Sequence, residues 1–137
     1  MVKIIENEEK SMDILQTTLN LLRKGNQLLL AKKKIGFGQG KYNGIGGEVE
    51  KGETPEQAMI RETEEEIFVT PTKYDRVGYL EFDEFYKGDK KRIIFHIYLV
   101  EEWQGEPMES EEMDPNGLTW IIFLIMKCFQ MIVIGFL

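Results

Sequence analysis

Glutamates gather in the stretch RETEEEIFV, which runs from Arg61 to Val69. On a helix of 3.6 residues per turn, Glu62, Glu65 and Glu66 fall on one stripe. Carboxylates at these spacings repel one another, and the negative end of the helix dipole adds to the penalty. A hard divalent cation such as Mg²⁺ takes oxygen ligands and would remove this repulsion while leaving positions for phosphate. A solvated helix face rich in glutamate, a good helix former, is the alternative that the stripe alone leaves open.

The helix that carries these carboxylates has a well-marked start. Thr54 can serve as the N-cap, Pro55 suits the first helical position, and Gln57 completes a Thr-x-x-Gln capping box. We expect the helix to end near Ile67. Small Ala58 shares the carboxylate stripe, and the packing residues face roughly the other way. These packing residues are Met59, Ile60, Thr63 and Ile67.

Two hairpins and a glycine-rich loop surround the helix in the chain. Residues 17–34 read as two apolar strands about a turn at Gly25. Aromatic and β-branched runs at 76–86 and 91–103, separated by the turn KGDK, predict a second hairpin. Residues 35–47 contain six glycines, which suits a loop whose backbone approaches another group closely.

The region GGEVEKGETPEQAMIRETEEEIFV, residues 46–69, resembles the Nudix box, G-x5-E-x7-R-E-U-x-E-E-x-G-U with U aliphatic. Seven residues fall in register with this pattern: Gly47, Glu53, Arg61, Glu62, Glu65, Glu66 and Val69. Thr63 stands at an aliphatic position, where we expect it only to weaken packing. Phe68 stands where the pattern has glycine, which commonly adopts a left-handed conformation that costs other residues about 1 kcal/mol. We therefore expect Phe68 to change the exit from the helix.

The resemblance extends from about Thr17 to Pro115 and looks similar to the MutT-type branch, which hydrolyses oxidised purine nucleoside triphosphates. It implies an α/β fold, the Nudix α/β/α sandwich with a mixed β-sheet, whose second helix should follow residue 115. The implied organisation is an N-terminal segment at 1–16, a Nudix hydrolase domain at 17–115 and an atypical apolar tail at 116–137. The C-terminal part of the fold is then expected to be incomplete.

The resemblance also implies roles for individual residues. The implied metal ligands are Gly46, through its carbonyl, with Glu62, Glu65 and Glu66. The implied catalytic residues are Glu53, Arg61, Glu62, Glu66 and Glu112. Either Glu53 or Glu112 could be the base or a further ligand, and Arg61 would orient a glutamate through a bidentate pair. The residues similar to substrate-contacting ones are Thr18, Lys33, Phe37, Asn43 and Phe82.

The chemistry implied is attack by water within a polyphosphate chain, giving a nucleoside monophosphate and pyrophosphate. Mg²⁺, or Mn²⁺ in its place, would clamp the phosphates and lower the pKa of a bound water. The chain would then be a pyrophosphohydrolase of nucleoside triphosphates, first of oxidised purines, with a place in nucleotide-pool sanitation and DNA repair. Two alternatives stay open: another nucleoside diphosphate-linked substrate, and a non-catalytic scaffold that binds metal or nucleotide.

Composition bears on partners and compartment. The net charge of −7 argues against binding duplex nucleic acid, since phosphate neutralisation needs clustered Lys and Arg. The single cysteine, Cys128, excludes an internal disulfide framework and fits a reducing compartment. Acids interrupt the first 16 residues, which matches neither a signal peptide nor a transit peptide. We expect a cytoplasmic protein, and the oligomeric state is open.

Composition changes abruptly in the tail. Seven acids lie between Glu101 and Asp114, but residues 116–137 have none, and Lys127 is their only charge. A membrane span would place Lys127 in mid-span, and a core helix would lack a polar face. A frameshift ranks first, because reading one nucleotide earlier permits WFDLDNIPYNEMFPDDSYWF, which resembles the normal Nudix continuation. A core segment ranks second and a membrane span last.

Overall fold

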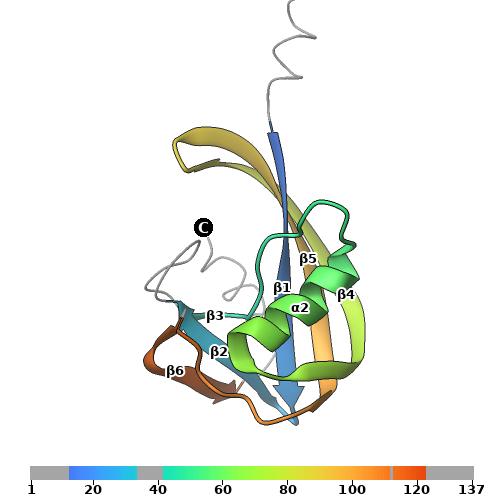
Figure 1. The fold of residues 1–137 in the computed structure, drawn as a ribbon, viewed down its shortest axis with the longest axis vertical. Coiled ribbons are helices and arrows are strands. Elements are labelled where there is room, and N and C mark those ends of the chain that lie inside the picture. Colours follow the sequence, from blue (N-terminus) through green and yellow to red (C-terminus); the bar gives the residue numbers. More distant parts are fainter. Residues whose placement is uncertain (1–12, 34–41, 112, 123–137) are drawn as a thin grey trace, which may run out of the picture.

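The computed structural model describes residues 13–33, 42–111 and 113–122. One mixed sheet dominates them, with a helix lying across one face (Figure 1). The elements in chain order are β1 (Asp13–Lys24), β2 (Gln27–Lys33), β3 (Tyr42–Asn43), α2 (Pro55–Ile67), β4 (Thr70–Tyr86), β5 (Asp89–Gln104) and β6 (Met113–Ile122). The strand order is β3-β2-β1-β5-β4, and β6 pairs with β2.

Both predicted hairpins are present. The turn between β1 and β2 places Lys24 opposite Gln27, and Gly25 supplies the positive φ of 61° that the turn requires. The turn between β4 and β5 pairs Tyr86 with Asp89. Beyond their shared turn β1 and β2 separate, and β1 instead runs parallel to β5 over Asp13–Leu22.

The sheet buries apolar side chains on both faces because successive strand residues point to opposite sides. On the face under α2, Leu22 of β1 packs with Met59 and Ile67 of the helix. On the opposite face, β1 contributes Leu19 and Leu21, which pack against apolar residues of β2 and β5. Even-numbered residues of β1 therefore face the helix and odd-numbered ones face the second cluster.

The helix begins as the sequence predicts. Thr54 is the N-cap, its side chain accepts a hydrogen bond from the Gln57 amide, and the Gln57 side chain accepts one from the Thr54 amide. The expected change at Phe68 is wrong, because Phe68 itself takes the left-handed C-cap conformation, with φ 61° and ψ 32°. Its ring is 53% exposed, so the side chain meets no obstacle that would force another exit.

Replacing Phe68 by glycine should therefore raise the free energy of unfolding by about 1 kcal/mol, since glycine adopts this conformation without a Cβ penalty. Phe68→Ala is the control, because it removes the exposed ring but keeps the penalty. Urea unfolding curves of both variants test the prediction. Equal stability of the two variants would show that the ring, and not the backbone conformation, sets the effect.

The tail begins as a strand. Residues 113–122 form β6, so the second helix expected after residue 115 does not start there. Trp120 of β6 packs against the core and stacks on Trp103, with ring centroids 6.1 Å apart. Among the described residues no helix is long and apolar enough to cross a membrane. Residues 123–137, on which the frameshift interpretation chiefly depends, lie outside the described residues.

Candidate active site

The loop before α2 pairs with the free edge of β1 in an antiparallel ladder. Asn20 and Ile45 exchange backbone hydrogen bonds, and the Thr18 amide donates to the Gly47 carbonyl at 2.9 Å. Gly46 lies between Ile45 and Gly47 in this ladder.

Two glycines allow the loop to fit between β1 and α2. A Cβ on Gly46 would come within 1.9 Å of the Thr18 carbonyl oxygen. A Cβ on Gly47 would come within 2.4 Å of the Glu62 carboxylate carbon. The missing side chain of Gly47 thus leaves the space that the Glu62 carboxylate occupies, which brings loop and helix together at this point.

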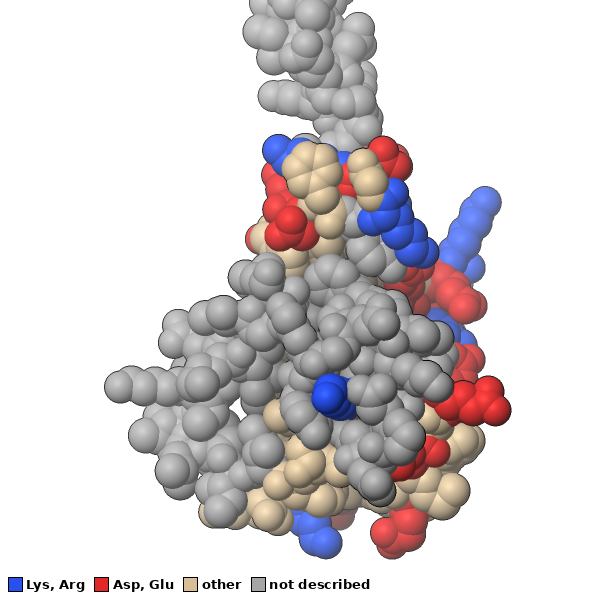
Figure 2. Space-filling model, turned by 90° about the vertical axis from the view of Figure 1, so that its left-hand side faces the viewer, with Lys and Arg blue, Asp and Glu red and all other residues tan. Residues whose placement is uncertain are grey.

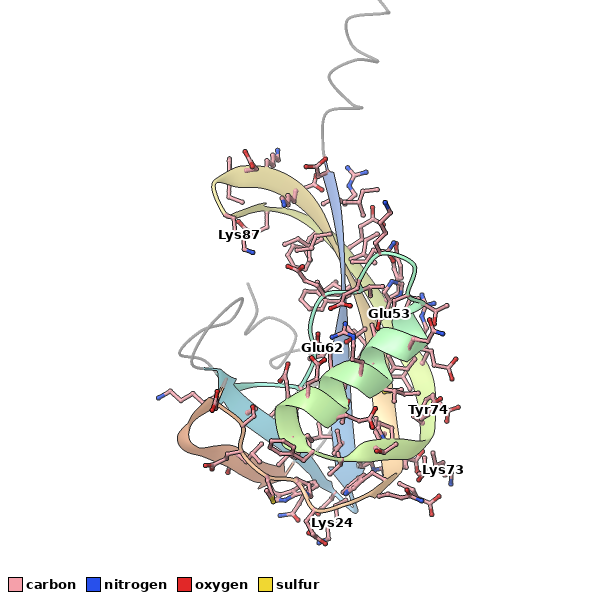
Figure 3. The ribbon with its side chains drawn as sticks, viewed as in Figure 1. Lys24, Glu53, Glu62, Lys73, Tyr74 and Lys87 are labelled. Carbon is pink, nitrogen blue, oxygen red and sulfur yellow. The ribbon has the colours of Figure 1, made fainter. Side chains whose placement is uncertain are left out.

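Arg61 ties the loop to the helix through every donor of its guanidinium. Its Nε and Nη2 donate to the two carboxylate oxygens of Glu53 at 2.7 and 2.9 Å, which is the bidentate pair expected of Arg61. Nη2 also donates to the Glu48 carbonyl, and Nη1 donates to Glu62 at 2.7 Å and Glu65 at 3.2 Å. These bonds use all five N–H groups. Glu53 lies beside the start of α2 and Glu62 along its side (Figure 3).

Glu53 is held as an anion. Hydrogen bonds from Arg61 lower the pKa of the Glu53 carboxyl, and in return Glu53 raises the pKa of Arg61. The Glu50 amide donates to Glu53 as well, at 3.0 Å. A carboxylate with a lowered pKa and occupied lone pairs is a weak base. The geometry therefore favours Glu53 as the anchor of Arg61 over Glu53 as a general base, and Glu112 lies outside the described residues.

The lowered pKa predicts how stability depends on pH. The ion pair of Glu53 stabilises the folded chain above the unfolded pKa of about 4.3, and this contribution is lost as the pH falls through the lower folded pKa. Glu53→Gln should therefore flatten the loss of stability below that pH, as measured by urea unfolding at several pH values. Asp83→Asn is the control, because Asp83 pairs with Arg92 and both side chains are exposed. Figure 2 shows acidic and basic side chains together at the protruding end of the β4–β5 hairpin.

For that exposed pair we expect only a small effect, which 1 M salt should remove. Arg92 also lowers the pKa of Asp83, so the control has the same sign. If Asp83→Asn flattened the pH dependence of stability as much as Glu53→Gln, the ion pair of Glu53 with Arg61 would contribute no more to acid unfolding than an exposed pair does.

The carboxylates of the predicted stripe differ in burial. Glu66 is only 2% exposed and Ala58 is fully buried, whereas the Glu65 side chain is 56% exposed. Ala58, Glu62 and Glu66 lie one turn apart, and Glu62 on this row contacts the loop at Gly47. The row therefore turns inward and Glu65 turns outward. The predicted packing face is confirmed, since Met59, Thr63 and Ile67 are buried and Ile60 partly so.

The donor set suits a hard divalent cation, because the predicted ligands offer carboxylate and carbonyl oxygens only. Within the described residues, no three His, Cys, Asp or Glu side chains already converge as a metal cluster. Glu62 and Glu65 instead share Nη1 of Arg61. A metal ion would also offset the cost of holding a charge as deeply buried as Glu66. Ligation by Gly46, Glu62, Glu65 and Glu66 stays a prediction.

The structure does not bring the predicted substrate residues Thr18 and Phe82 together. Thr18 lies on the helix face of the sheet, two residues from Asn20, whose side chain contacts α2. Phe82 lies on the opposite face, where its ring stacks on Phe95 with centroids 5.9 Å apart. Lys33 ends β2, and Asn43 in β3 pairs with Ala31 through the backbone, but neither side chain is described. Phe37 lies outside the described residues.

Thr17 is the threonine that shares a face with Phe82. It is paired with Phe95 across β1 and β5, and it is 8% exposed. The Oγ1 atoms of Thr17 and Thr18 are both buried without a hydrogen-bond partner in the described part of the chain. The sequence alone does not show which of the two threonines shares a face with Phe82, because that depends on which strand residues face the helix.

Comparisons with known proteins identify the family of this chain. Residues 16–121 match the NUDIX domain family. An oxidized purine nucleoside triphosphate hydrolase of Danio rerio is 42% identical over 99 residues, which are 72% of this chain and 62% of that protein. An 8-oxo-dGTP diphosphatase of Escherichia coli is 33% identical over 102 residues, 73% of this chain and 76% of that protein. The chain thus spans less than two thirds of the length of the Danio rerio relative.

The fold is also similar to a solved structure. A MutT NUDIX hydrolase from Burkholderia pseudomallei superposes with a TM-score of 0.69 at 22% identity, covering 80% of this chain and 84% of that one. This likeness confirms the expected fold class. In the described part of this chain, the sheet carries α2 alone.

Proposed function

Because this chain belongs to the NUDIX domain family, we propose that it is a divalent-metal-dependent pyrophosphohydrolase of nucleoside triphosphates, with oxidised purine nucleotides as preferred substrates. The observation that carries the proposal is the Arg61 cluster, in which one guanidinium binds Glu53 and Glu62 while Glu62 lies against Gly47. The names of the relatives from Danio rerio and Escherichia coli support the substrate class.

We assign some residues to metal binding and others to the support of the metal ligands. Glu62, Glu66 and the Gly46 carbonyl would hold the cation from the helix side and the loop side, with Glu65 at the solvent edge. A bound divalent cation offsets the phosphate charge and lowers the pKa of a water molecule. Arg61, anchored by Glu53, keeps Glu62 in place against the loop. This rigid support is what positions carboxylates for a transition state without a reorganisation cost.

The nucleoside would bind on the sheet face opposite α2. Phe82 is partly exposed there and stacks on the buried ring of Phe95, which lies opposite Thr17 in the β1–β5 register. The hydroxyls of Thr17 and Thr18 are both buried without a partner among the described residues, and a hydrogen bond from a ligand would offset the cost of either. Because only Thr17 shares a face with Phe82, we assign the role expected of Thr18 to Thr17.

The two neighbouring threonines give a matched test of this assignment. Thr17→Val should raise KM about fivefold with little change in kcat, because one hydrogen bond to the bound nucleotide is lost. Thr18→Val removes the same group from the other face and should leave KM unchanged. Steady-state kinetics of both variants decide between the faces, and a larger KM effect from Thr18→Val would reverse the assignment.

The activity itself is tested on the purified chain. Pyrophosphate release is measured with 8-oxo-dGTP, dGTP and ATP, and formation of AMP is measured with ADP-ribose, each with Mg²⁺ and with EDTA. We expect release from 8-oxo-dGTP that EDTA abolishes, with a higher kcat/KM than for dGTP. Nucleotide binding without turnover would instead support the non-catalytic scaffold. Turnover of ADP-ribose alone would indicate a nucleoside diphosphate-linked substrate in place of a triphosphate.

A further inference from the structure

A buried polar pair joins β1 to the middle of α2. Asn20 and Thr63 are both fully buried, and Nδ2 of Asn20 donates to Oγ1 of Thr63 at 3.0 Å. Nδ2 also donates to the Met59 carbonyl at 3.2 Å. The Thr63 hydroxyl donates to the same carbonyl at 2.7 Å. Three polar groups thus meet at one buried point beneath the helix.

This arrangement corrects the expectation that Thr63 only weakens packing. A buried hydroxyl without a partner is costly, but here Asn20 supplies the donor and Met59 the acceptor. Hydrogen bonds depend on direction as well as distance, so these bonds restrict the position of the helix more narrowly than apolar contacts alone. The pair therefore sets both the rotation and the height of α2 on β1.

The same Asn20 also holds the glycine loop. The main-chain amide of Asn20 donates to the Ile45 carbonyl at 2.5 Å, and the main-chain carbonyl of Asn20 accepts from the Ile45 amide at 3.2 Å. Ile45 precedes Gly46, and Thr63 follows Glu62. One residue of β1 is therefore bonded to the loop through its main chain and to the helix through its side chain, directly beside a predicted ligand on each.

We propose that Asn20 and Thr63 are a positioning pair that fixes α2 against the glycine loop and so sets the separation of Glu62 and Gly46. The inference rests on the proposed function for its consequence, metal binding, but its structural part can be measured without metal. Neither residue is one of the predicted metal ligands. Both act through their neighbours, as the supporting residues around metal sites do.

The pair predicts an asymmetry between two nearly isosteric substitutions. Thr63→Val leaves a donor of Asn20 buried without its partner, so the melting temperature should fall clearly. Asn20→Leu leaves Thr63 bonded to Met59 and also removes Oδ1 of Asn20, which is buried without a partner among the described residues. Its melting temperature should fall less. The double variant should be more stable than Thr63→Val alone, because no polar group is then left unpaired.

Mn²⁺ affinity, measured by electron paramagnetic resonance of the free ion, separates an effect on the placement of Glu62 and Gly46 from an effect on stability. Thr63→Val and the double variant should both bind Mn²⁺ about tenfold more weakly than wild type, the lower end of the effect of supporting residues. Thr63→Ser keeps the hydroxyl and should restore the affinity. Ile67→Val shortens a buried side chain on the same helix, so it should lower the melting temperature without changing Mn²⁺ affinity.

Metal-free amide exchange followed by NMR completes the test. In the double variant, exchange of the Ile45 amide should be about tenfold faster, and in Ile67→Val it should match wild type. A double variant with wild-type Mn²⁺ affinity and wild-type Ile45 exchange would overturn the inference. A wild-type chain that neither binds Mn²⁺ nor hydrolyses nucleotides would overturn the proposed function, while an Ile45 response to the variants would still support the positioning pair.

Discussion

Glu66→Gln is expected to lower kcat by about a thousandfold, because it removes the charge of a buried carboxylate that we propose as a metal ligand. The free energy of unfolding should stay the same or rise by about 1 kcal/mol. A neutral amide of the same shape is cheaper to bury than a carboxylate, and the repulsion from Glu62 one turn away disappears. Pyrophosphate release and urea unfolding measure the two effects separately.

Glu64→Gln is the matched control for Glu66→Gln. Glu64 carries the same charge on the same helix but is exposed, and its carboxylate accepts a hydrogen bond from Thr70 at 3.0 Å. It is not a predicted ligand, so hydrolysis should stay within about twofold of wild type, as for most exposed substitutions. Near wild-type turnover by Glu66→Gln at low Mg²⁺ would remove Glu66 from the metal site.

Local elements could be predicted from the sequence because their signals are local. Thr54, Pro55 and Gln57 mark the start of α2 through bonds within one helical turn. The turn at Gly25 is marked by a residue that tolerates positive φ. The box residues could be aligned by spacing alone, since the pattern fixes their separation along the chain.

Long-range geometry could not be predicted in the same way. The parallel pairing of β1 with β5 places Thr17 opposite Phe95, a partner 78 positions away in the chain, and only this register shows which threonine faces Phe82. The expectation for Thr63 was wrong because its partner, Asn20, lies on β1, 43 positions away in the chain. At both positions the missing information was which groups meet across the core.

Backbone strain and charge pairing were also under-determined. The sequence shows that Phe68 stands at a glycine position, but not whether the chain leaves the helix differently or Phe68 adopts the left-handed conformation. In the structure Phe68 adopts it, and its side chain is exposed. Likewise the pattern predicts a bidentate pair for Arg61 without showing that the same guanidinium also binds Glu62, Glu65 and the Glu48 carbonyl.

Arg61→Lys should be among the most damaging conservative changes in the chain. A lysine has three donors on one nitrogen, so it cannot span the two oxygens of Glu53 and also reach Glu62. We expect the free energy of unfolding to fall by about 2 kcal/mol, from hydrogen bonds lost to partly buried carboxylates. We expect kcat/KM to fall about a hundredfold, because Glu62 is no longer held against Gly47.

Arg92→Lys provides the comparison, since Arg92 also binds two carboxylates, those of Glu81 and Asp83, but all three side chains are exposed to solvent. It should change neither activity nor stability appreciably, because water and salt screen such pairs. A double-mutant cycle between Arg61→Lys and Glu53→Gln then isolates the bidentate pair. The effects of the two substitutions on stability and on kcat/KM could instead prove additive. The bidentate pair of Arg61 with Glu53 would then not be what holds the loop and the helix together, and Glu62 would have to be positioned by the glycine loop alone.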